Sequence, residues 1–393
     1  MFVRTFRKSA LLTGLLLTGV VLAGAALLIW PQAAAAGVSR GLSICSSVII
    51  PALFPFLVLS GFLVRSGLSA KIGRRLDRVT RFLFGLPGCC GAGILIGFIG
   101  GYPAGGVAVG ELVERGDITR EEGKRMLRFC VNGGPAFIIS AVGAGLMGQP
   151  VYGFMLYGAH IAAALTLGIA GRFRRGAAVE ETGESGCARS GLRVKIPPQS
   201  AASAFVESVN AACRSLLYMC GFVVLFAALL SLGDASGVTA AVETVLCAPF
   251  QLAGADTAGI ASLFPCLLEV SCGCVEAAAS GPAAPFLLGM ALGWGGLSVH
   301  CQLTASLHGQ RLIDRGFFAA RGLHALLGGL LTLLLFRFVP LAVSTGISFS
   351  ETVVKPYTTS ATASLALLLM CALFLLTLAT RRTSSGGSSS KKN

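Results

Sequence analysis

Two carboxylates lie within one apolar stretch of the chain, well away from any basic loop. They are Glu269 and Glu276, in the segment from Gly259 to Ser280. An ionised side chain at bilayer depth costs about 3 kcal/mol unless it is protonated, paired or facing a watery cavity, so its presence there predicts a role in binding a substrate, a proton or an ion. Glu269 is the first candidate, because Glu276 lies nearer the outer end of the segment, where contact with solvent explains it.

A second kind of candidate site comes from backbone that cannot stay helical. The sequence reads Asn-Gly-Gly-Pro from Asn132 to Pro135 and Gly-Gly-Tyr-Pro from Gly100 to Pro103. Where a helix opens at such points, the free N–H groups at the start of the next helix bind an anion without any basic side chain. This pattern favours a small anionic or polar solute.

Two further polar residues, His300 and Gln302, follow the pair Gly295-Gly296 and are expected to line the same cavity. The alternative for His300 is a hydrogen bond between helices, which is the commoner role of a lone histidine in a helical bundle. The complete set of candidate substrate-binding residues is Gly100, Gly101, Tyr102, Pro103, Gly105, Asn132, Gly133, Gly134, Pro135, Glu269, Ser271, Gly273, Gly295, Gly296, Ser298, His300 and Gln302.

The sequence contains no motif for enzymatic chemistry. A Walker loop, an H-E-x-x-H pair and a nucleophile elbow are all missing, so we predict no enzyme. Cys89 and Cys90 are adjacent and Cys272 and Cys274 are one residue apart, and neither spacing is typical of a zinc or redox site. We therefore expect no metal site and no cofactor apart from a coupling cation or proton. A metal carrier would instead need Cys272, Cys274 or Cys301.

The elements that position these residues are predicted to be membrane helices. Of the 393 residues, 54% are hydrophobic and 12% are charged, and the mean hydropathy is +0.79, which is far from the composition of a soluble globular protein. This excludes a soluble enzyme, a disordered chain and a secreted disulfide scaffold. The net charge of +14 lies in short loops between apolar runs, which indicates membrane orientation and not nucleic-acid binding.

Ten apolar segments follow from the hydropathy, and two of them differ from the rest. Phe84 to Gly110 and Gly259 to Ser280 contain clustered Gly and Pro or carboxylates, which a straight lipid-facing helix does not tolerate, so we expect two re-entrant hairpins. The eight expected spans, each long enough to cross about 30 Å of hydrocarbon, are Leu11 to Trp30, Leu42 to Val64, Phe129 to Met147, Val151 to Ile169, Ser215 to Leu232, Ala284 to Leu307, Leu323 to Leu341 and Ala361 to Ala379.

The basic residues decide how these segments are threaded. If both hairpins enter and leave on one side, 27 of the 31 Lys and Arg residues fall on the cytoplasmic side together with both termini, as the positive-inside rule requires. One of the loops so placed holds Arg311, Arg315 and Arg321. The N-terminal run resembles a signal peptide, but its length and Trp30 at its end favour an uncleaved anchor.

The two halves of the chain resemble each other around one long hydrophilic loop. Each half reads as a span, a broken hairpin and a span with a Gly-Gly kink, and matched points lie roughly 160 to 170 residues apart. The hairpins enter from opposite sides, and inverted repeats with broken helices are the architecture of secondary transporters. The alternative is that Gly only lets the helices pack closely.

The predicted organisation follows from this repeat. It is a membrane anchor and link at 1–40, a first repeat of span, hairpin and spans at 41–171, a cytoplasmic linker at 172–204, a second such repeat at 205–345, a transmembrane span within 346–380 and a disordered tail at 381–393. The charged stretch from Glu111 to Arg128 predicts a single amphipathic helix at the membrane surface.

Four motifs together resemble a known family. They are Pro-Ala-Leu-Phe-Pro-Phe from Pro51, Gly-Gly-Tyr-Pro-Ala-Gly from Gly100, Arg-Phe-Cys-Val-Asn-Gly-Gly-Pro from Arg128 and Gly-Gly-Leu-Ser-Val-His-Cys-Gln from Gly295. Over about residues 40 to 345 the chain is similar to sporulation integral membrane proteins of the YlbJ (SpoVV) type, in the nucleoside-recognition or Gate domain family. That family's wider fold resembles the concentrative nucleoside transporters. This agrees with an all-α polytopic membrane protein of about eight transmembrane helices plus two re-entrant hairpins in an inverted repeat.

The resemblance implies a role in endospore formation, because such proteins move dipicolinic acid across the outer forespore membrane. We expect a secondary transporter of a small anionic solute, with dipicolinic acid as the leading candidate. Its other expected partner is the lipid bilayer; we expect no nucleic acid, and the sequence leaves open whether the protein forms a homo-oligomer. Two alternatives are a nucleoside or nucleobase carrier and a non-transporting membrane assembly factor of sporulation. Glu269 suits a dianion only if it is protonated or couples a cation.

Overall fold

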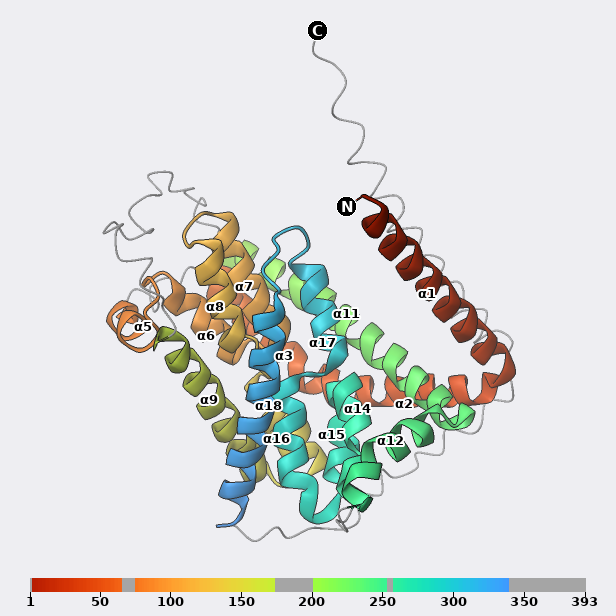
Figure 1. Ribbon diagram of the computed structural model, residues 1–393. Coiled ribbons are helices and arrows are strands. Elements are labelled where there is room, and N and C mark those ends of the chain that lie inside the picture. The colour runs from red at the N-terminus through yellow and green to blue at the C-terminus, as the bar shows by residue number, and fades with distance from the viewer. Residues whose placement is uncertain (1, 66–74, 174–200, 253–256, 339–393) are drawn as a thin grey trace.

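The computed structural model describes residues 2–65, 75–173, 201–252 and 257–338, and every element in these ranges is a helix (Figure 1). Before the linker they are α1 (Phe2–Ile29), α2 (Pro31–Ile44), η1 (Cys45–Ile49), α3 (Ile50–Arg65), α5 (Asp77–Phe84), α6 (Cys90–Ile99), α7 (Tyr102–Glu114), α8 (Arg120–Cys130), η2 (Ala136–Leu146) and α9 (Pro150–Phe173). After it they are α11 (Ala201–Ser236), α12 (Val238–Leu252), α13 (Ala258–Ala261), α14 (Leu263–Leu268), α15 (Val270–Ala278), η4 (Gly281–Ala283), α16 (Ala284–Trp294), α17 (Gly296–Ser306) and α18 (Arg315–Phe336).

The chain is a multi-pass membrane protein. Four described stretches are long and apolar enough to cross a bilayer, namely Pro150–Phe173, Ala201–Ser236, Gly281–Ser306 and Arg315–Phe336. A fifth candidate joins Leu17–Ile29 to Pro31–Ser47 through a bend of 97°. The described residues therefore give four or five spans where the hydropathy predicts eight. The last expected span, at 361–379, and the tail at 381–393 lie outside the described residues.

One of the missing spans is broken in two. Across the segment expected to cross from Phe129 to Met147, α8 ends at Cys130, residues 131–134 leave the helix, and η2 begins at Ala136. Pro135 precedes η2 and has no N–H for a continuous helix. The break lies where the sequence Asn-Gly-Gly-Pro predicts an opening.

Apart from α5 (Asp77–Phe84) in the first half and α12, α13 and η4 in the second, the described elements come in the same order in the two halves. A long helical stretch comes first (α2 to α3, then α11), followed by a pair of short helices (α6 and α7, then α14 and α15). A helix interrupted in the middle comes next (α8 and η2, then α16 and α17), and a long helix closes each half (α9, then α18). Helix boundaries shift the predicted units slightly, since α2 runs across the boundary at 40/41 and α11 begins inside the expected linker 172–204.

Each pair of short helices is held together by glycine. A Cβ on Gly105 would lie 2.9 Å from the Cα of Gly97, so α6 and α7 touch through bare backbone. In the second half a Cβ on Gly273 would lie 2.5 Å from the Cα of Cys266, which brings α14 equally close to α15. Small residues at such crossings let helices approach closely within a membrane. Both expected hairpins are therefore compact helix pairs.

A long helix contact runs between the first stretch of each half. Gly37 packs against Ala227 and Ala228, and Gly61 near the other end packs against Ser208, so α2 to α3 lies antiparallel to α11. At the far end of α3, Arg65 and Glu207 form an ion pair with a 3.8 Å separation. This helix pair forms one wall of the site described below.

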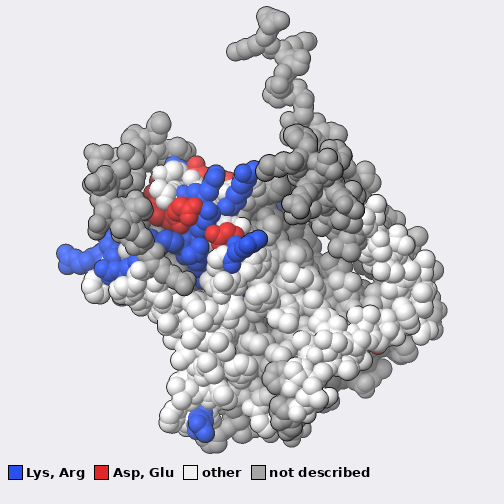
Figure 2. Space-filling model, viewed as in Figure 1, with Lys and Arg blue, Asp and Glu red and all other residues white. Residues whose placement is uncertain are grey.

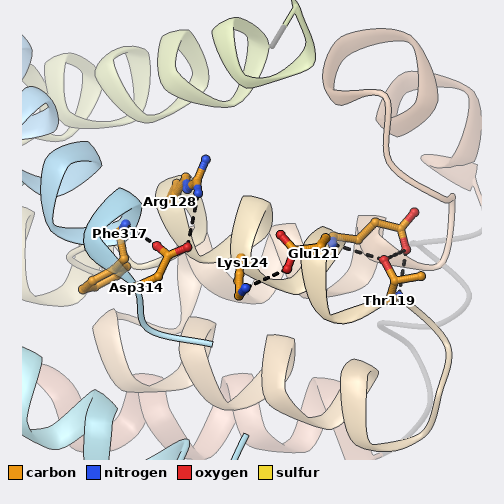
Figure 3. Close-up of polar contacts among 7 residues, drawn as sticks. Thr119, Glu121, Lys124, Arg128, Asp314 and Phe317 are labelled. Carbon is orange, nitrogen blue, oxygen red and sulfur yellow. Dashed lines mark hydrogen bonds and ion pairs between the residues drawn. The ribbon is translucent and has the colours of Figure 1, made fainter. Parts of the chain in front are cut away.

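Charged residues gather at one end of the face shown in Figure 2, over α5, α7 and α8, while most of the other described surface in this view is uncharged. The prediction of a single amphipathic helix from Glu111 to Arg128 is wrong. The stretch contains the end of α7, a turn, and α8, because Thr119 starts a new helix. Its hydroxyl accepts a bond from the N–H of Glu122, whose carboxylate accepts one from the N–H of Thr119 (Figure 3). Such a reciprocal capping box marks a helix start.

The last basic loop is also shorter than predicted. Asp314 caps the start of α18 by accepting the N–H of Phe317 at 2.8 Å, and it lies 3.5 Å from Arg128 of α8 (Figure 3). The helix therefore begins at Arg315. Arg321, expected in this loop, lies two turns inside α18 and is 1% exposed, so the sequence-based assignment of Arg321 to a solvated loop is wrong.

Candidate functional site

A pocket opens between the two pairs of short helices and the wall made by α3 and α11. Its empty space, including the open mouth, is about 650 Å3, and its lining is mostly apolar. Eight of the predicted site residues line it, namely Gly100, Gly101, Tyr102, Pro103, Gly134, Glu269, Ser271 and Gln302. The sequence analysis missed the apolar remainder of the wall, which is Ile49, Leu53, Leu57, Ile99, Ala136, Phe137, Met219, Val223, Val270 and Val299.

Three helices begin at residues that line this pocket, namely α7 at Tyr102, η2 at Ala136 and α15 at Val270. A fourth, α17, begins at Gly296, outside the lining and against the backbone of Glu269. A helix N-terminus carries about half a positive charge and several free N–H groups. No side chain caps α7, η2 or α17. The pocket therefore contains the N-termini of α7 and η2 without side-chain caps, and no Lys, Arg or His belongs to its lining.

Glu269 lies at the N-terminus of α15, the one of these helices whose start is capped by a side chain. It is 2% exposed, and its Oε2 accepts the backbone N–H of Cys272 at 2.7 Å. The hydroxyl of Ser298, on α17, donates to Oε1 at 3.5 Å. None of the ion pairs within the described residues includes Glu269. Among the described residues, the N-terminus of α15 and not a basic side chain holds this carboxyl group.

The break between α8 and η2 is held by side chains. Asn132 is fully buried, and its Nδ2 donates to the carbonyl of Phe129 at 2.7 Å. The N–H of Gly133 donates to Nε2 of His160, on α9, at 3.1 Å. Neither Asn132 nor Gly133 lines the pocket. Asn132 therefore satisfies the open helix end, a role closer to a cap than to a ligand for the solute.

The break between α16 and α17 is closed by partners from three directions. The carbonyl of Leu292 accepts the hydroxyl of Tyr102, from α7, at 2.7 Å. The carbonyl of Trp294 lies 3.0 Å from Nε2 of His300, and Trp294 Nε1 donates to the carbonyl of Leu267, at the end of α14, at 3.0 Å. Buried helix ends need such partners because water cannot reach them. His300 thus makes the contact expected of the helix-bonding alternative.

The other predicted residues lie outside the lining and shape the backbone around it. Gly295 and Gly296 both have positive φ, 84° and 76°, which only glycine adopts readily. Pro135 precedes the first residue of η2, and Gly105 and Gly273 make the close helix contacts described above. Glu276 is exposed.

Three buried polar residues at the centre of the molecule were not among the predictions. His160 and His324 stack with their ring centroids 4.5 Å apart, and Nε2 of His324 lies 3.0 Å from the carbonyl of His160. Arg321 lies one turn before His324 on α18. The rule that singled out Glu269, an ionisable side chain inside an apolar segment, would have found His160 and His324 but not Arg321, which was assigned to a loop. Within the described residues no three His, Cys, Asp or Glu side chains are placed to hold a metal ion.

Comparison with known proteins gives one related sequence. The chain is 26% identical over 323 residues to the sporulation integral membrane protein YlbJ of Bacillus subtilis (strain 168), and the match covers 78% of each chain. No family model matches the chain, and no solved structure matches it. The match confirms the YlbJ part of the predicted resemblance; the Gate domain part stays a prediction.

Proposed function

We propose that this chain, which belongs to the YlbJ type of sporulation integral membrane proteins, is a secondary transporter of a small anionic solute. The observation that carries the proposal is the convergence of three helix N-termini, those of α7, η2 and α15, on one mostly apolar pocket. Helix N-termini bind carboxylates through N–H groups and the helix dipole. Apolar walls bind the faces of a ring, and a few polar groups set its orientation.

The solute class that fits this pocket is an aromatic dicarboxylate, and the proposed solute is dipicolinic acid, moved across the outer forespore membrane. The uncapped N-termini of α7 and η2 suit its two carboxylates, and residues such as Leu53 and Phe137 suit its ring. Glu269 already has an N-terminus of its own at α15. A dianionic solute shares the pocket with Glu269 when this side chain is protonated or when a coupling cation enters with the solute.

The proposed topology is the one that the charges favour. Eight spans cross the membrane, the two short-helix pairs re-enter from opposite sides, and both termini are cytoplasmic. The repeats then form an inverted pair like that of concentrative nucleoside transporters, which places the pocket near the bilayer midplane. The charged end in Figure 2 supports this orientation.

Uptake of labelled dipicolinic acid into proteoliposomes that contain the purified full chain tests the proposal. We expect saturable uptake, and Glu269→Gln should lower it at least about tenfold, equivalent to about 1.4 kcal/mol, because the variant replaces the carboxyl group whose Oε2 accepts the N–H of Cys272 at the start of α15. Glu276→Gln is the matched control, since Glu276 is exposed on the same helix, and it should transport normally.

Other outcomes separate the alternatives. Uptake of a nucleoside in place of dipicolinic acid would support the carrier suggested by the wider fold. If neither solute enters although the protein is inserted and folded, the transport proposal fails and an assembly role is favoured.

A further inference from the structure

We propose that Arg321 is a tethered cation that occupies the place where broken-helix transporters bind a coupling metal ion. In such transporters, unwound carbonyls and the C-terminal ends of half-helices coordinate the ion. Here the guanidinium of Arg321 lies at two such ends. What this implies for transport rests on the proposed function. What it implies for stability depends only on the hydrogen bonds between Arg321 and backbone oxygens.

The contacts of Arg321 are with backbone carbonyls from both halves of the chain. Nη2 donates to the carbonyl of Arg128 at 2.8 Å, and Nη1 donates to that of Val131 at 2.5 Å. Nη1 also lies 3.5 Å from the carbonyl of Gly293. The first two oxygens are at the end of α8 and the third is at the end of α16. One side chain from α18 therefore joins the two helix breaks.

These oxygens have no helical partner because the helices end there. In a continuous helix the carbonyl of Arg128 would accept the N–H of residue 132 and that of Val131 the N–H of residue 135, but Val131 is extended, with φ of −94° and ψ of 92°, and Pro135 has no N–H. Burial makes such unpaired carbonyls costly. A cation that meets several of them at once removes that cost.

The charge of Arg321 is balanced without a carboxylate. None of the ion pairs in the described part of the chain includes it, and its guanidinium carbon lies 6.0 Å from the centre of the Phe317 ring. Each helix C-terminus is equivalent to about −0.5 of an elementary charge. The two ends that meet at Arg321, those of α8 and α16, together offer about one negative charge, which a single fixed cation neutralises.

Two consequences follow. The wild-type protein needs no metal cation at this position, so solute uptake should be the same in sodium, potassium and N-methylglucamine media. Removing the side chain should leave a space lined by carbonyl oxygens that a free guanidinium ion fills again.

Thermal unfolding of the purified full chain in detergent tests the second consequence without any transport assay. Arg321→Ala should lower the Tm by about 10 °C, because three buried carbonyls lose their donor. Guanidinium at about 10 to 50 mM, far below the molar range that denatures proteins, should restore part of that loss with a saturable dependence. It should not raise the Tm of wild type or of Arg315→Ala, the control at an exposed position on the same helix.

A second variant keeps the test decisive if Arg321→Ala does not fold. Arg321→Lys keeps the charge but not the fork of donors, so its Tm should be intermediate between wild type and Arg321→Met. A Met variant as stable as wild type, or a folded Ala variant that no guanidinium concentration stabilises, would overturn the tethered cation.

The uptake measurements in the three cation media are a separate test. Wild-type uptake that requires sodium would also overturn the proposal about Arg321. If wild type transports nothing at all, the proposed function fails, and the Tm measurements still decide whether Arg321 is the cation that holds the helix ends.

Discussion

The two interrupted helices open by different means. Between α8 and η2, residues 131–134 leave the helix, and neither Gly133 nor Gly134 has a positive φ. The opening depends instead on hydrogen bonds from or to the side chains of Asn132, His160 and Arg321. Between α16 and α17 the turn is made by Gly295 and Gly296, with φ of 84° and 76°. The first break is specified by distant partners, and the second by the local backbone.

The short-helix pairs differ in a related way. The first turns at Gly100-Gly101, with Gly101 at a φ of 86° and no ionisable side chain at the turn. The second turns at Glu269, in extended conformation, with φ of −145° and ψ of 127°. One half therefore offers uncapped N–H groups and the other adds a fixed carboxylate. Two halves with the same element order can thus supply unlike groups to one pocket.

The largest effect on stability is expected for Gly296→Ala. Its Cβ would lie 2.8 Å from the backbone nitrogen of Val270 and 3.0 Å from the Cα of Glu269, at a φ that alanine rarely adopts. Strain and overlap should lower the free energy of unfolding by about 3 kcal/mol or more. Because the chain also contains Trp30, unfolding followed by the fluorescence of Trp294 in a Trp30→Phe background measures this. Gly221→Ala, with open space around it, is the control and should be nearly neutral.

A somewhat smaller loss is expected for His160→Ala, about 2 to 3 kcal/mol, because the N–H of Gly133 is then left buried without an acceptor. Hydrogen exchange resolved by peptide checks the cause. Amides from 131 to 138 should exchange faster, while those around 293–298 should change little. Equal acceleration at both breaks would contradict the view that only the first depends on distant side chains.

The smallest of the three effects is expected for Gly133→Ala. Its Cβ would meet Cδ1 of Ile138 at 2.9 Å and the hydroxyl of Tyr102 at 3.0 Å, which are ends of side chains, and its φ is not positive. We expect a loss of about 1 kcal/mol, read from the same Trp294 fluorescence transition. A cost as large as that of Gly296→Ala would erase the distinction between the two breaks.

Much of the local structure could be predicted from the sequence. Clustered Gly and Pro located both helix breaks and both short-helix pairs, and the isolated Glu269 lines the pocket. The error at Asn132 was one of role, since its amide binds the carbonyl three residues earlier in place of facing the pocket.

Long-range partners could not be predicted in this way. Arg321 and Val131 are 190 residues apart, as are Tyr102 and Leu292, and no local pattern specifies such pairs. Arg321 was assigned to a loop because it follows Arg311 and Arg315 in the sequence, and only the cap at Asp314 shows that the helix has already begun.

The length of α11 has a consequence for the membrane that contains it. Its 36 residues extend about 54 Å at 1.5 Å per residue, whereas the hydrocarbon core is about 30 Å thick. Its antiparallel partner, α2 to α3, is of similar length, and the Arg65–Glu207 ion pair lies near one end of the two helices. A rigid pair of this length meets the bilayer by tilting or by extending beyond it. Its inclination should therefore change with lipid chain length, and bilayer thickness would then set the angle of the wall against which the pocket is built.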